Sequence, residues 1–392
     1  MAKKDSRFIR RIFILLGLVL NTIVGVALLF SFFAQFITPA FTIVFTYAGL
    51  AFPYLLFANL FFVLYWVFIK YQYSFISLFL LLLNVNNIDK YFQFSGLDKP
   101  EKCANCVKVM SYNAKLFGVY NSDNPAVRER ESAQVFSFLQ NVKPDIVCFQ
   151  EFFHDKSGKL GINTVDSVLS VMKLNKKTPR ETRQHYATYY PAHLRNEYYF
   201  GLAIFSKYKI LHAEPVQMPD SLSTNGALYA DIKYKNDTVR IYCLHLESFK
   251  MDKVDYELGR MIIDNNINDP DFNKKAMKIS DKMSVAFRKR ARQADAVRAH
   301  IDSCRYPVIV CGDFNDTPIS YSYNRIARGL KDTFRTSGKG EAVTYHGDAF
   351  PSYRIDYILH HRKFNSYGHT VCDSITVSDH YPVYSYITIQ KR

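Results

Sequence analysis

Eight polar or ionisable residues lie at or near the ends of short apolar segments, and their types could support metal-assisted chemistry. They are Asn113, Glu151, His245, Asp313, Asn315, Asp356, Asp379 and His380. Carboxylate and amide oxygens suit Mg²⁺ or Mn²⁺, which keep water positions open for a phosphate group. Taken singly, each residue has a simpler explanation, as a turn cap or a buried hydrogen-bond partner. The whole set favours a metal-assisted reaction at a phosphate.

Other chemistries lack their sequence motifs. No glycine-rich loop precedes Lys-Ser or Lys-Thr, which disfavours nucleotide-driven phosphoryl transfer. No Gly-x-Ser-x-Gly elbow points to a serine hydrolase. The seven cysteines are too few and too scattered for a disulfide scaffold. Cys103 and Cys106 have no second pair to complete a zinc site, and they would form a local disulfide if their compartment is oxidising.

The first 86 residues predict a transmembrane region of about three helices. Apolar segments cover residues 12–33, 41–69 and 71–86, and a bilayer core needs about 20 residues to cross. Five basic residues precede the first segment, which predicts a cytoplasmic N-terminus. Three crossings would place the rest of this multi-pass protein on the extracytoplasmic side. If the third segment only lies on the surface, the rest stays cytoplasmic.

After the apolar region, residues 87–106 are polar and aromatic and predict a linker, and residues 107–392 have the composition of a soluble domain. Residues 249–282 are rich in Lys, Asp, Asn and Met and suggest an insertion, either a lid or a surface elaboration. The whole chain carries a formal charge of +15. Such a charge attracts polyanions or anionic lipid head groups, although it can also serve solubility alone.

Short apolar segments bounded by turn residues predict strands in the C-terminal domain. They are VKVMSYN, PDIVCFQ, GLAIFS, LYADIKY, VRIYCLHL, YPVIVCGDF, RIDYILHH and YPVYSYITI. Residues 126–140 and 284–303 have helical composition. Many strands with a few interleaved helices predict an α+β fold in which sheets pack face to face with helices outside.

Seven segments in order resemble the endonuclease/exonuclease/phosphatase superfamily, which includes type I deoxyribonucleases, abasic-site endonucleases and neutral sphingomyelinases. They are SYNAKLFG, DIVCFQE, GLAIFSK, CLHLES, VIVCGDFND, YRIDYIL and VSDHYPV. The resemblance spans about residues 107 to 389. It implies a four-layered α/β sandwich, formed by two packed mixed sheets flanked by helices. It also implies a metal-dependent phosphoesterase.

The resemblance implies metal ligands at three positions. Glu151 matches the principal metal carboxylate, with Asn113 and Asp379 close to the same ion, and Mg²⁺ is the expected ion with Mn²⁺ as an alternative. One position departs from the abasic-site branch: Ala114 and Lys115 follow Asn113, so the extra acidic ligand of that branch is missing. The departure weakens a DNA-repair function.

The resemblance also implies catalytic and substrate-binding roles. Asp313 would deprotonate the attacking water, Asn315 would orient it and contact the phosphate, and His245 would help bind the substrate. His380 would face the scissile phosphate with its imidazole oriented by Asp356. A substrate contact is also expected from Arg354, in the same segment as Asp356.

The sequence therefore predicts a membrane-anchored phosphodiesterase acting by metal-assisted attack of water. The substrate would be nucleic acid or a phospholipid head group, and the second expected partner is the lipid bilayer itself. The alternative is a catalytically weak membrane scaffold or receptor that binds a phosphate-containing partner. No protein partner can be predicted.

Overall fold

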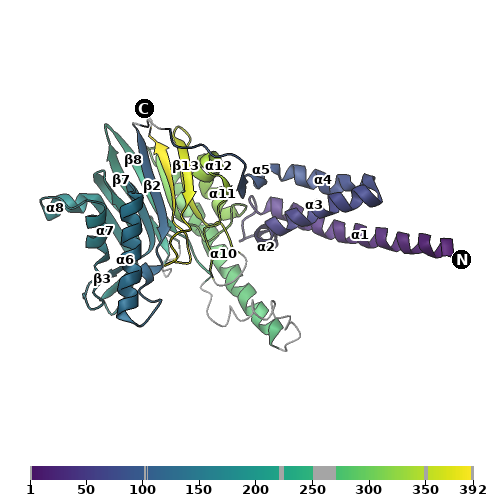
Figure 1. The fold of residues 1–392 in the computed structure, drawn as a ribbon, viewed down its shortest axis with the longest axis horizontal. Helices are drawn as coiled ribbons and strands as arrows, with labels where there is room; N and C mark the ends of the chain where they lie inside the picture. Colours follow the sequence, from purple (N-terminus) through teal and green to yellow (C-terminus); the bar gives the residue numbers. More distant parts are fainter. Residues whose placement is uncertain are drawn as a thin grey trace.

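The computed structural model describes residues 2–100, 103, 105–219, 225–249, 271–347 and 352–389. A bundle of N-terminal helices projects from a sandwich of two sheets, and the N-terminus lies at the end of the bundle away from the sandwich (Figure 1). The bundle helices are α1 (Ala2–Phe33), α2 (Val44–Leu50), α3 (Phe52–Ile69), α4 (Ser74–Leu83) and α5 (Val85–Ile88), with a 3-10 turn, η1 (Tyr71–Tyr73), before α4.

A buried polar network joins the three long helices of the bundle. Trp66 Nε1 of α3 donates to Asn21 Oδ1 of α1 at 2.9 Å, and Asn21 Nδ2 donates to Ser77 Oγ of α4 at 2.6 Å. Within an apolar bundle such bonds satisfy groups that would otherwise be buried without partners, and they fix how the helices face one another. The network therefore sets the register of the bundle.

The expectation of three membrane spans is not supported. Among the described residues, two helices are long and apolar enough to cross a membrane, Arg10–Phe33 and Phe52–Ile69. The third apolar segment forms only Tyr71–Leu83. At 1.5 Å per residue this helix covers about 20 Å, which is short of the roughly 30 Å bilayer core. The predicted extracytoplasmic position of the C-terminal domain required a third crossing, so this prediction is not supported either.

The first sheet of the sandwich has the strand order β13-β14-β2-β3-β5-β4. Its strands are β2 (Cys106–Asn113), β3 (Ile146–Asp155), β4 (Tyr186–Leu194), β5 (Tyr198–Ser206), β13 (Asn365–Val371) and β14 (Val383–Thr388). The central pair β2 and β3 is parallel, and the other neighbours are antiparallel. Asn113 and Glu151 are therefore carried to the same edge of this sheet.

The second sheet has the order β10-β12-β9-β8-β7-β6. Its strands are β6 (Ile210–Pro215), β7 (Gly226–Tyr234), β8 (Asp237–His245), β9 (Val308–Asp313), β10 (Leu330–Asp332) and β12 (Asp356–His361). The pair β8 and β9 is parallel, with His245 in register with Asp313, and Asp313 in turn faces Asp356 on antiparallel β12. Three predicted site residues thus meet at one edge of the sheet.

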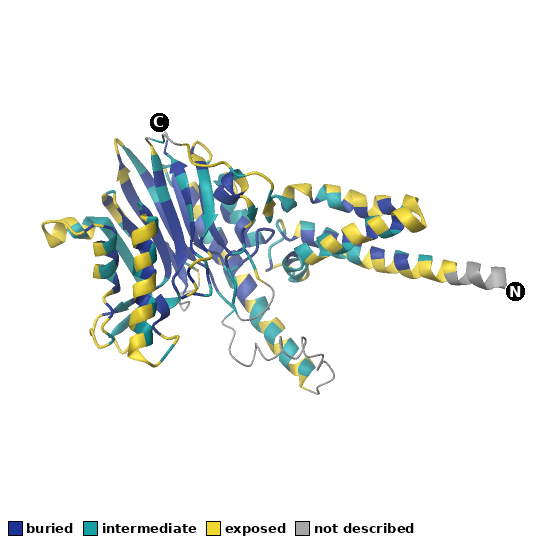
Figure 2. Ribbon diagram, viewed as in Figure 1, coloured by how far each residue is buried: buried dark blue, intermediate teal, exposed yellow. Residues whose placement is uncertain are grey.

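The two sheets pack face to face around an apolar core that includes Val109, Ile204, Ile241 and Ile358. Helices α6 (Pro125–Val142) and α7 (Thr164–Val171) cover the outer face of the first sheet, and α10 (Phe272–Asp302) and α11 (Tyr321–Ala327) cover that of the second. The strands are mostly buried and the outer faces of the helices exposed (Figure 2). This arrangement confirms the predicted four-layered sandwich.

All eight predicted strands form, and the additional strands β4, β6, β10 and β13 of the two sheets were not predicted. The helix expected over residues 284–303 begins earlier, because α10 starts at Phe272 and so includes the last part of the expected insertion. Residues 250–270 of that insertion lie outside the described residues. The remaining short elements are η2 (Lys115–Gly118), α8 (Pro179–Thr182), η3 (Arg183–His185), α12 (Thr333–Ser337), β1 (Phe92–Gln93) and β11 (Gly340–Glu341).

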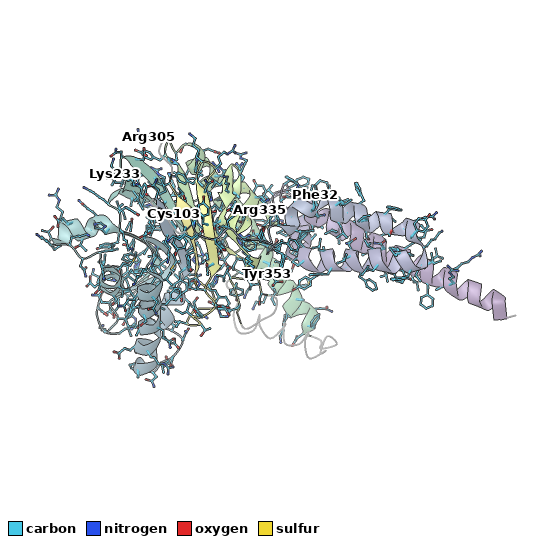
Figure 3. The ribbon with its side chains drawn as sticks, turned by 45° about the horizontal axis from the view of Figure 1, so that its top comes forward. Phe32, Cys103, Lys233, Arg305, Arg335 and Tyr353 are labelled. Atoms are coloured by element: carbon cyan, nitrogen blue, oxygen red, sulfur yellow. A yellow bond between two sulfur atoms is a disulfide. The ribbon has the colours of Figure 1, made fainter. Side chains whose placement is uncertain are left out.

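The segment predicted as a linker packs against the sandwich. Strand β1 pairs with β11, and Asp89 forms an ion pair of 2.7 Å with Arg335, which is labelled near this junction in Figure 3. Lys90 is buried and donates from Nζ to Gln35 Oε1 at 3.1 Å and to Asn324 Oδ1 at 2.9 Å. These contacts hold the bundle and the sandwich together. Cys103 and Cys106 form a disulfide.

Candidate active site

Asp313, at the end of β9, is the most extensively contacted carboxylate of the site. Its Oδ2 accepts from Asn113 Nδ2 at 3.1 Å and Asn315 Nδ2 at 3.3 Å, and its Oδ1 accepts from the Asn315 backbone N–H at 2.8 Å. His245 Nε2 and His380 Nε2 lie 3.5 and 3.7 Å from the same Oδ2. The side chain is fully buried, so its orientation is fixed by these contacts.

Burial is also the main cause of the raised pKa of Asp313. The neighbouring Asp356 carboxylate raises this pKa further, whereas the interactions with His380 and His245 oppose the shift. A carboxylate with a raised pKa is a stronger base than an ordinary aspartate. The surroundings of Asp313 therefore suit a group that accepts a proton.

His380 lies between two carboxylates. Its Nδ1 is 2.9 Å from Asp356 Oδ2, and its Nε2 faces Asp313. Burial lowers the pKa of His380, but the Asp356 and Asp313 carboxylates outweigh this effect and raise the pKa to about 10. The imidazole is therefore a cation at neutral pH. His245, in contrast, is buried with weaker compensation, and its pKa is lowered.

Glu151 lies at an irregularity in β3, where the register with β5 shifts between Phe149 and Phe152. Its φ of 48° is unusual for a residue with a side chain and costs of order 1 kcal/mol. This conformation turns the side chain toward the site, where Asn113 Nδ2 donates to Oε1 at 3.3 Å. Burial raises the pKa of Glu151, but the side chain remains 36% exposed and accessible from solvent.

A cavity of about 280 Å³ opens beside Glu151. Leu116, Phe200, Asn225 and His245 contribute to its lining. The cavity lets a substrate reach the Glu151 carboxylate, while Asp313 lies buried behind it. The Asn315 side chain is held in place by a second bond, from its Nδ2 to the Leu246 carbonyl at 3.0 Å.

Asp379 interacts with a residue whose role the sequence did not predict. Its Oδ2 lies 3.2 Å from Lys115 Nζ. Lys115 begins a run of four residues with positive φ, Lys115 to Gly118, that turns the chain sharply after β2. The positive charge of Lys115 partly offsets the negative charge of Asp379.

Arg354 is not brought to the site. It is buried beneath the sheet edge, where it forms an ion pair with Asp332 and donates from Nη1 to the Lys90 carbonyl at 2.9 Å. Its guanidinium stacks on the rings of Phe334 and Tyr357. The expectation that Arg354 contacts substrate therefore has no support in its position.

Three further residues support the site and were not predicted. Ser378 Oγ donates to the Asn113 carbonyl at 2.7 Å and accepts from the His380 backbone N–H at 3.0 Å. The Thr344 hydroxyl accepts from the backbone N–H of Asp356 at 3.0 Å. The Tyr345 ring packs on the imidazole of His380 with centroids 5.0 Å apart. Only Ser378 was detectable in the sequence, within the segment VSDH.

Among the described residues, one group of three ionisable side chains could hold a metal by proximity alone. Atoms of Asp313, Asp356 and His380 lie within 4.8 Å of one another. However, His380 is protonated at neutral pH and directs Nδ1 at Asp356, and an imidazolium cannot ligate a metal. The oxygen atoms around Glu151 are the better donor set for a hard divalent ion.

The domain that forms the sandwich and carries this site matches a known protein family. The Endonuclease/Exonuclease/phosphatase family model matches residues 110–380, and the chain belongs to this family, whose members are generally metal-dependent phosphodiesterase- or nuclease-like hydrolases. A second model, for a domain of unknown function (DUF8431), matches residues 10–91 of the helical region. No curated protein matches the sequence significantly.

Solved structures with this fold are distant in sequence. D. rerio TDP2 humanized by 14 mutations is 18% identical, with 73% of this chain and 100% of that chain covered and a TM-score of 0.47. A Bacteroides vulgatus family member is 16% identical, with 73% and 99% covered and a TM-score of 0.48. The human Nocturnin catalytic domain is 15% identical, with 76% and 97% covered and a TM-score of 0.46.

Proposed function

We propose that this protein is a membrane-anchored, Mg²⁺-dependent phosphodiesterase. The observation that carries the proposal is the convergence at one edge of the sandwich of Asp313, a buried basic carboxylate, and His380, a cationic imidazole, beside the accessible carboxylate of Glu151. A base, a cation and a metal-binding oxygen are the three components needed to bring water to a negatively charged phosphate.

Glu151 would hold the metal together with Asp379, which also pairs with Lys115. Asn113 would have to turn its amide to contribute an oxygen, because its Nδ2 faces Glu151 and its Oδ1 accepts from the Lys115 backbone N–H. The donor set fits a hard ion because its members are oxygen ligands and the Glu151 side chain reaches a solvent-accessible cavity. When bound, the ion would neutralise phosphate charge and stabilise the leaving oxygen. Mn²⁺ has the same ligand preferences and is expected to substitute.

The protein side chains would divide the remaining work. Asp313, held by the Asn315 backbone N–H and the Asn113 amide, would accept the proton of the attacking water. Asn315 would orient that water and the phosphate. His380 would stabilise negative charge in the transition state, because Asp356 keeps its imidazole charged. His245, with its lowered pKa, would bind substrate as a neutral hydrogen-bonding group.

Membrane anchoring is supported by what surrounds the two long apolar helices. Only 22% of the apolar stretch of each of these two helices is buried within the protein, whereas a helix of a protein core would be mostly buried. Large apolar side chains such as Phe13, Ile23, Phe57 and Phe68 are exposed around the bundle. Apolar surface of this extent needs an apolar environment, and lipid provides one.

The substrate class is tested by a metal-dependent turnover screen of the detergent-solubilised full chain. Supercoiled DNA, RNA, sphingomyelin, glycerophospholipids and inositol phosphates would be compared, each with Mg²⁺ and with EDTA. Asp313→Asn is the matched control for contaminating activity. We expect Mg²⁺-dependent hydrolysis of a nucleic acid or a lipid by the native chain only. Equal turnover by the control, or none on any substrate, would rule out the proposal.

Anchoring is tested separately by membrane fractionation of the full chain. We expect the protein to remain in the membrane pellet after washing with alkaline carbonate and to enter solution with detergent. A chain with Ile23→Lys and Phe57→Lys, both at exposed positions of the bundle, should be released or degraded. Release of the native chain by carbonate would show that the bundle does not span the bilayer.

A further inference from the structure

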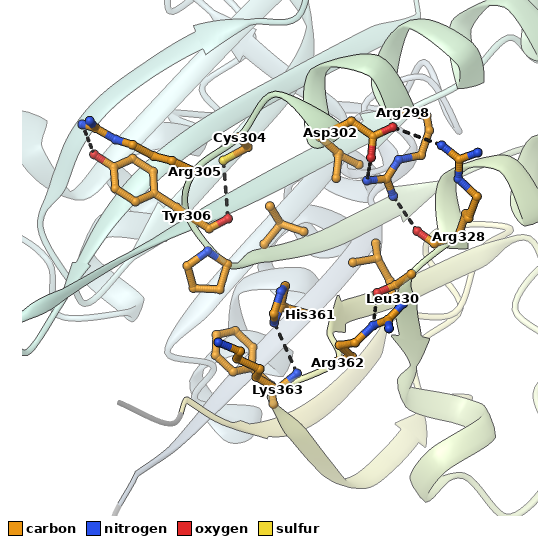
Figure 4. Close-up of a pocket in the computed structure, with 15 residues that line it drawn as sticks. Arg298, Asp302, Cys304, Arg305, Tyr306, Arg328, Leu330, His361, Arg362 and Lys363 are labelled. Atoms are coloured by element: carbon orange, nitrogen blue, oxygen red, sulfur yellow. Dashed lines mark hydrogen bonds and ion pairs between the residues drawn. The ribbon is translucent and has the colours of Figure 1, made fainter. Parts of the chain in front are cut away.

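A second cavity, of about 500 Å³, is lined by 15 residues, none of them assigned to the site described above (Figure 4). Its walls come from the C-terminal end of α10, the loop that leads into β9, residues 328–330 and the turn at 361–364. The side chains of Tyr306 and His361 also line the cavity. The cavity is larger than the one beside Glu151, and the proposed hydrolysis makes no use of it.

Basic residues are concentrated in this cavity. Five of its 15 lining residues are Arg or Lys, compared with 50 of 392 in the whole chain. Asp302 is the only acidic residue among those that line it, and it already accepts from Arg298 at 2.6 Å and from Arg328 at 3.2 Å. Asp302 therefore offsets only part of the positive charge around the cavity, and the remaining positive charge attracts anions.

The cations differ in their freedom to reach a ligand. Arg298 is buried and fixed, since its Nη1 also donates to the Arg328 carbonyl at 2.7 Å. Arg328, Arg362 and Lys363 are exposed at the rim. The bond from Arg362 Nε to the Gly329 carbonyl, at 3.3 Å, uses one of the five N–H groups of that guanidinium. The rim therefore offers donors from three directions.

The position of the cavity makes it a separate site. Val308 lines it at the first residue of β9, and Asp313 ends the same strand. Likewise β12 begins at Asp356 and ends at His361, which lines the cavity. Five residues of extended chain span roughly 17 Å, so an ordinary small molecule in the cavity cannot also contact the catalytic carboxylates.

We propose that this cavity binds a small polyanion carrying at least two clustered phosphate groups. Guanidinium groups recognise phosphate oxygens through paired, charge-assisted hydrogen bonds, and Lys363 adds a mobile point charge. The cations surround a volume too large for a single phosphate to contact all of them. A ligand with several anionic groups can contact more of these cations at once than one phosphate can.

The test is a titration of the detergent-solubilised full chain with inorganic tripolyphosphate, by calorimetry and by thermal shift. EDTA is present throughout, so that residual Mg²⁺ does not bind the phosphate compounds. The pocket variant is Arg362→Ala with Lys363→Ala. The matched control, Lys176→Ala with Lys177→Ala, removes the same charge from exposed positions elsewhere. Both pairs are exposed, so both variants should fold.

We expect tripolyphosphate to bind the native and control chains alike and the pocket variant at least tenfold more weakly. Orthophosphate should bind the native chain at least tenfold more weakly than tripolyphosphate. Equal losses in the two variants would mean diffuse attraction to a basic surface. Unchanged binding in the pocket variant would assign the anion to another site, and no binding to the native chain would remove the proposal altogether.

Discussion

The charge on His380 depends on Asp356, and the variant Asp356→Asn tests this dependence. Asparagine preserves the shape of the side chain and can still accept from Nδ1, but it removes the negative charge 2.9 Å from the ring. Two unit charges about 4 Å apart interact by about 4 kcal/mol at an effective dielectric constant of 20. One pKa unit corresponds to about 1.4 kcal/mol, so the His380 pKa should fall by about 3 units.

The measurement is the pH dependence of turnover on the substrate found in the screen. In the native chain the rate should rise with pH as Asp313 loses its proton, at a pH above the ordinary range for aspartate. The rate should fall again near pH 10, as His380 loses its proton. In Asp356→Asn the alkaline fall should move to about pH 7, and turnover at pH 8 should decrease by at least tenfold.

A control variant, Asp123→Asn, removes an exposed carboxylate that is far from Asp356 in the sequence, and it should leave the pH profile of turnover unchanged. Thermal unfolding of Asp356→Asn checks that a lower rate does not reflect a lost fold. If turnover falls while the alkaline limb remains near pH 10, then Asp356 does not set the charge of His380. The electrostatic role assigned to that imidazole would then be refuted.

Further predictions concern the base, the metal, the fold and the bundle. Asp313→Asn should lower turnover by roughly 100-fold or more at an unchanged Tm; a near-normal rate would exclude it as the base. EDTA should abolish turnover and Mg²⁺ restore it, and activity in EDTA would exclude the metal. Gly312→Ala should destabilise the sandwich by about 1–3 kcal/mol in chemical denaturation, because the added Cβ would lie 2.3 Å from the Leu244 carbonyl oxygen. Unchanged stability would show that β8 and β9 can separate. Asn21→Leu should destabilise the bundle by about 1 kcal/mol, as Trp66 and Ser77 lose their shared partner; an unaltered thermal transition in detergent would show that the network is dispensable.

The buried strands were predictable because their residues are locally apolar and β-branched. The strands that were missed lie at or near sheet edges, where one face meets solvent. Edge strand β4, for example, has no fully buried residue, and most of edge strand β6 is exposed. The third apolar segment was predicted to span the membrane because hydropathy does not reveal where a helix begins or ends. Its helix is limited to Tyr71–Leu83: it begins after Lys70 and ends at the turn at Asn84.

Arg354 and Lys115 show why the site was only partly predictable. Arg354 is adjacent in sequence to residues at the sheet edge, but its side chain turns to the buried partner Asp332. Lys115 lies in the segment SYNAKLFG, but its contact with Asp379 follows from the left-handed turn after β2. Both outcomes depend on backbone direction, which residue type alone does not determine.

The sequence by itself determined which residues could take part in chemistry and which segments would be strands, because apolar pattern and residue type act over a few neighbouring positions. The tertiary structure decided how those residues act on one another. Asp313 and His380 are 67 positions apart in the chain, and only the packing of one sheet on the other brings their side chains within 3.7 Å. Burial at that contact raises the pKa of Asp313, whereas the neighbouring carboxylates raise the pKa of His380 against the effect of burial. Burial and these neighbours are properties of the assembled fold rather than of any segment.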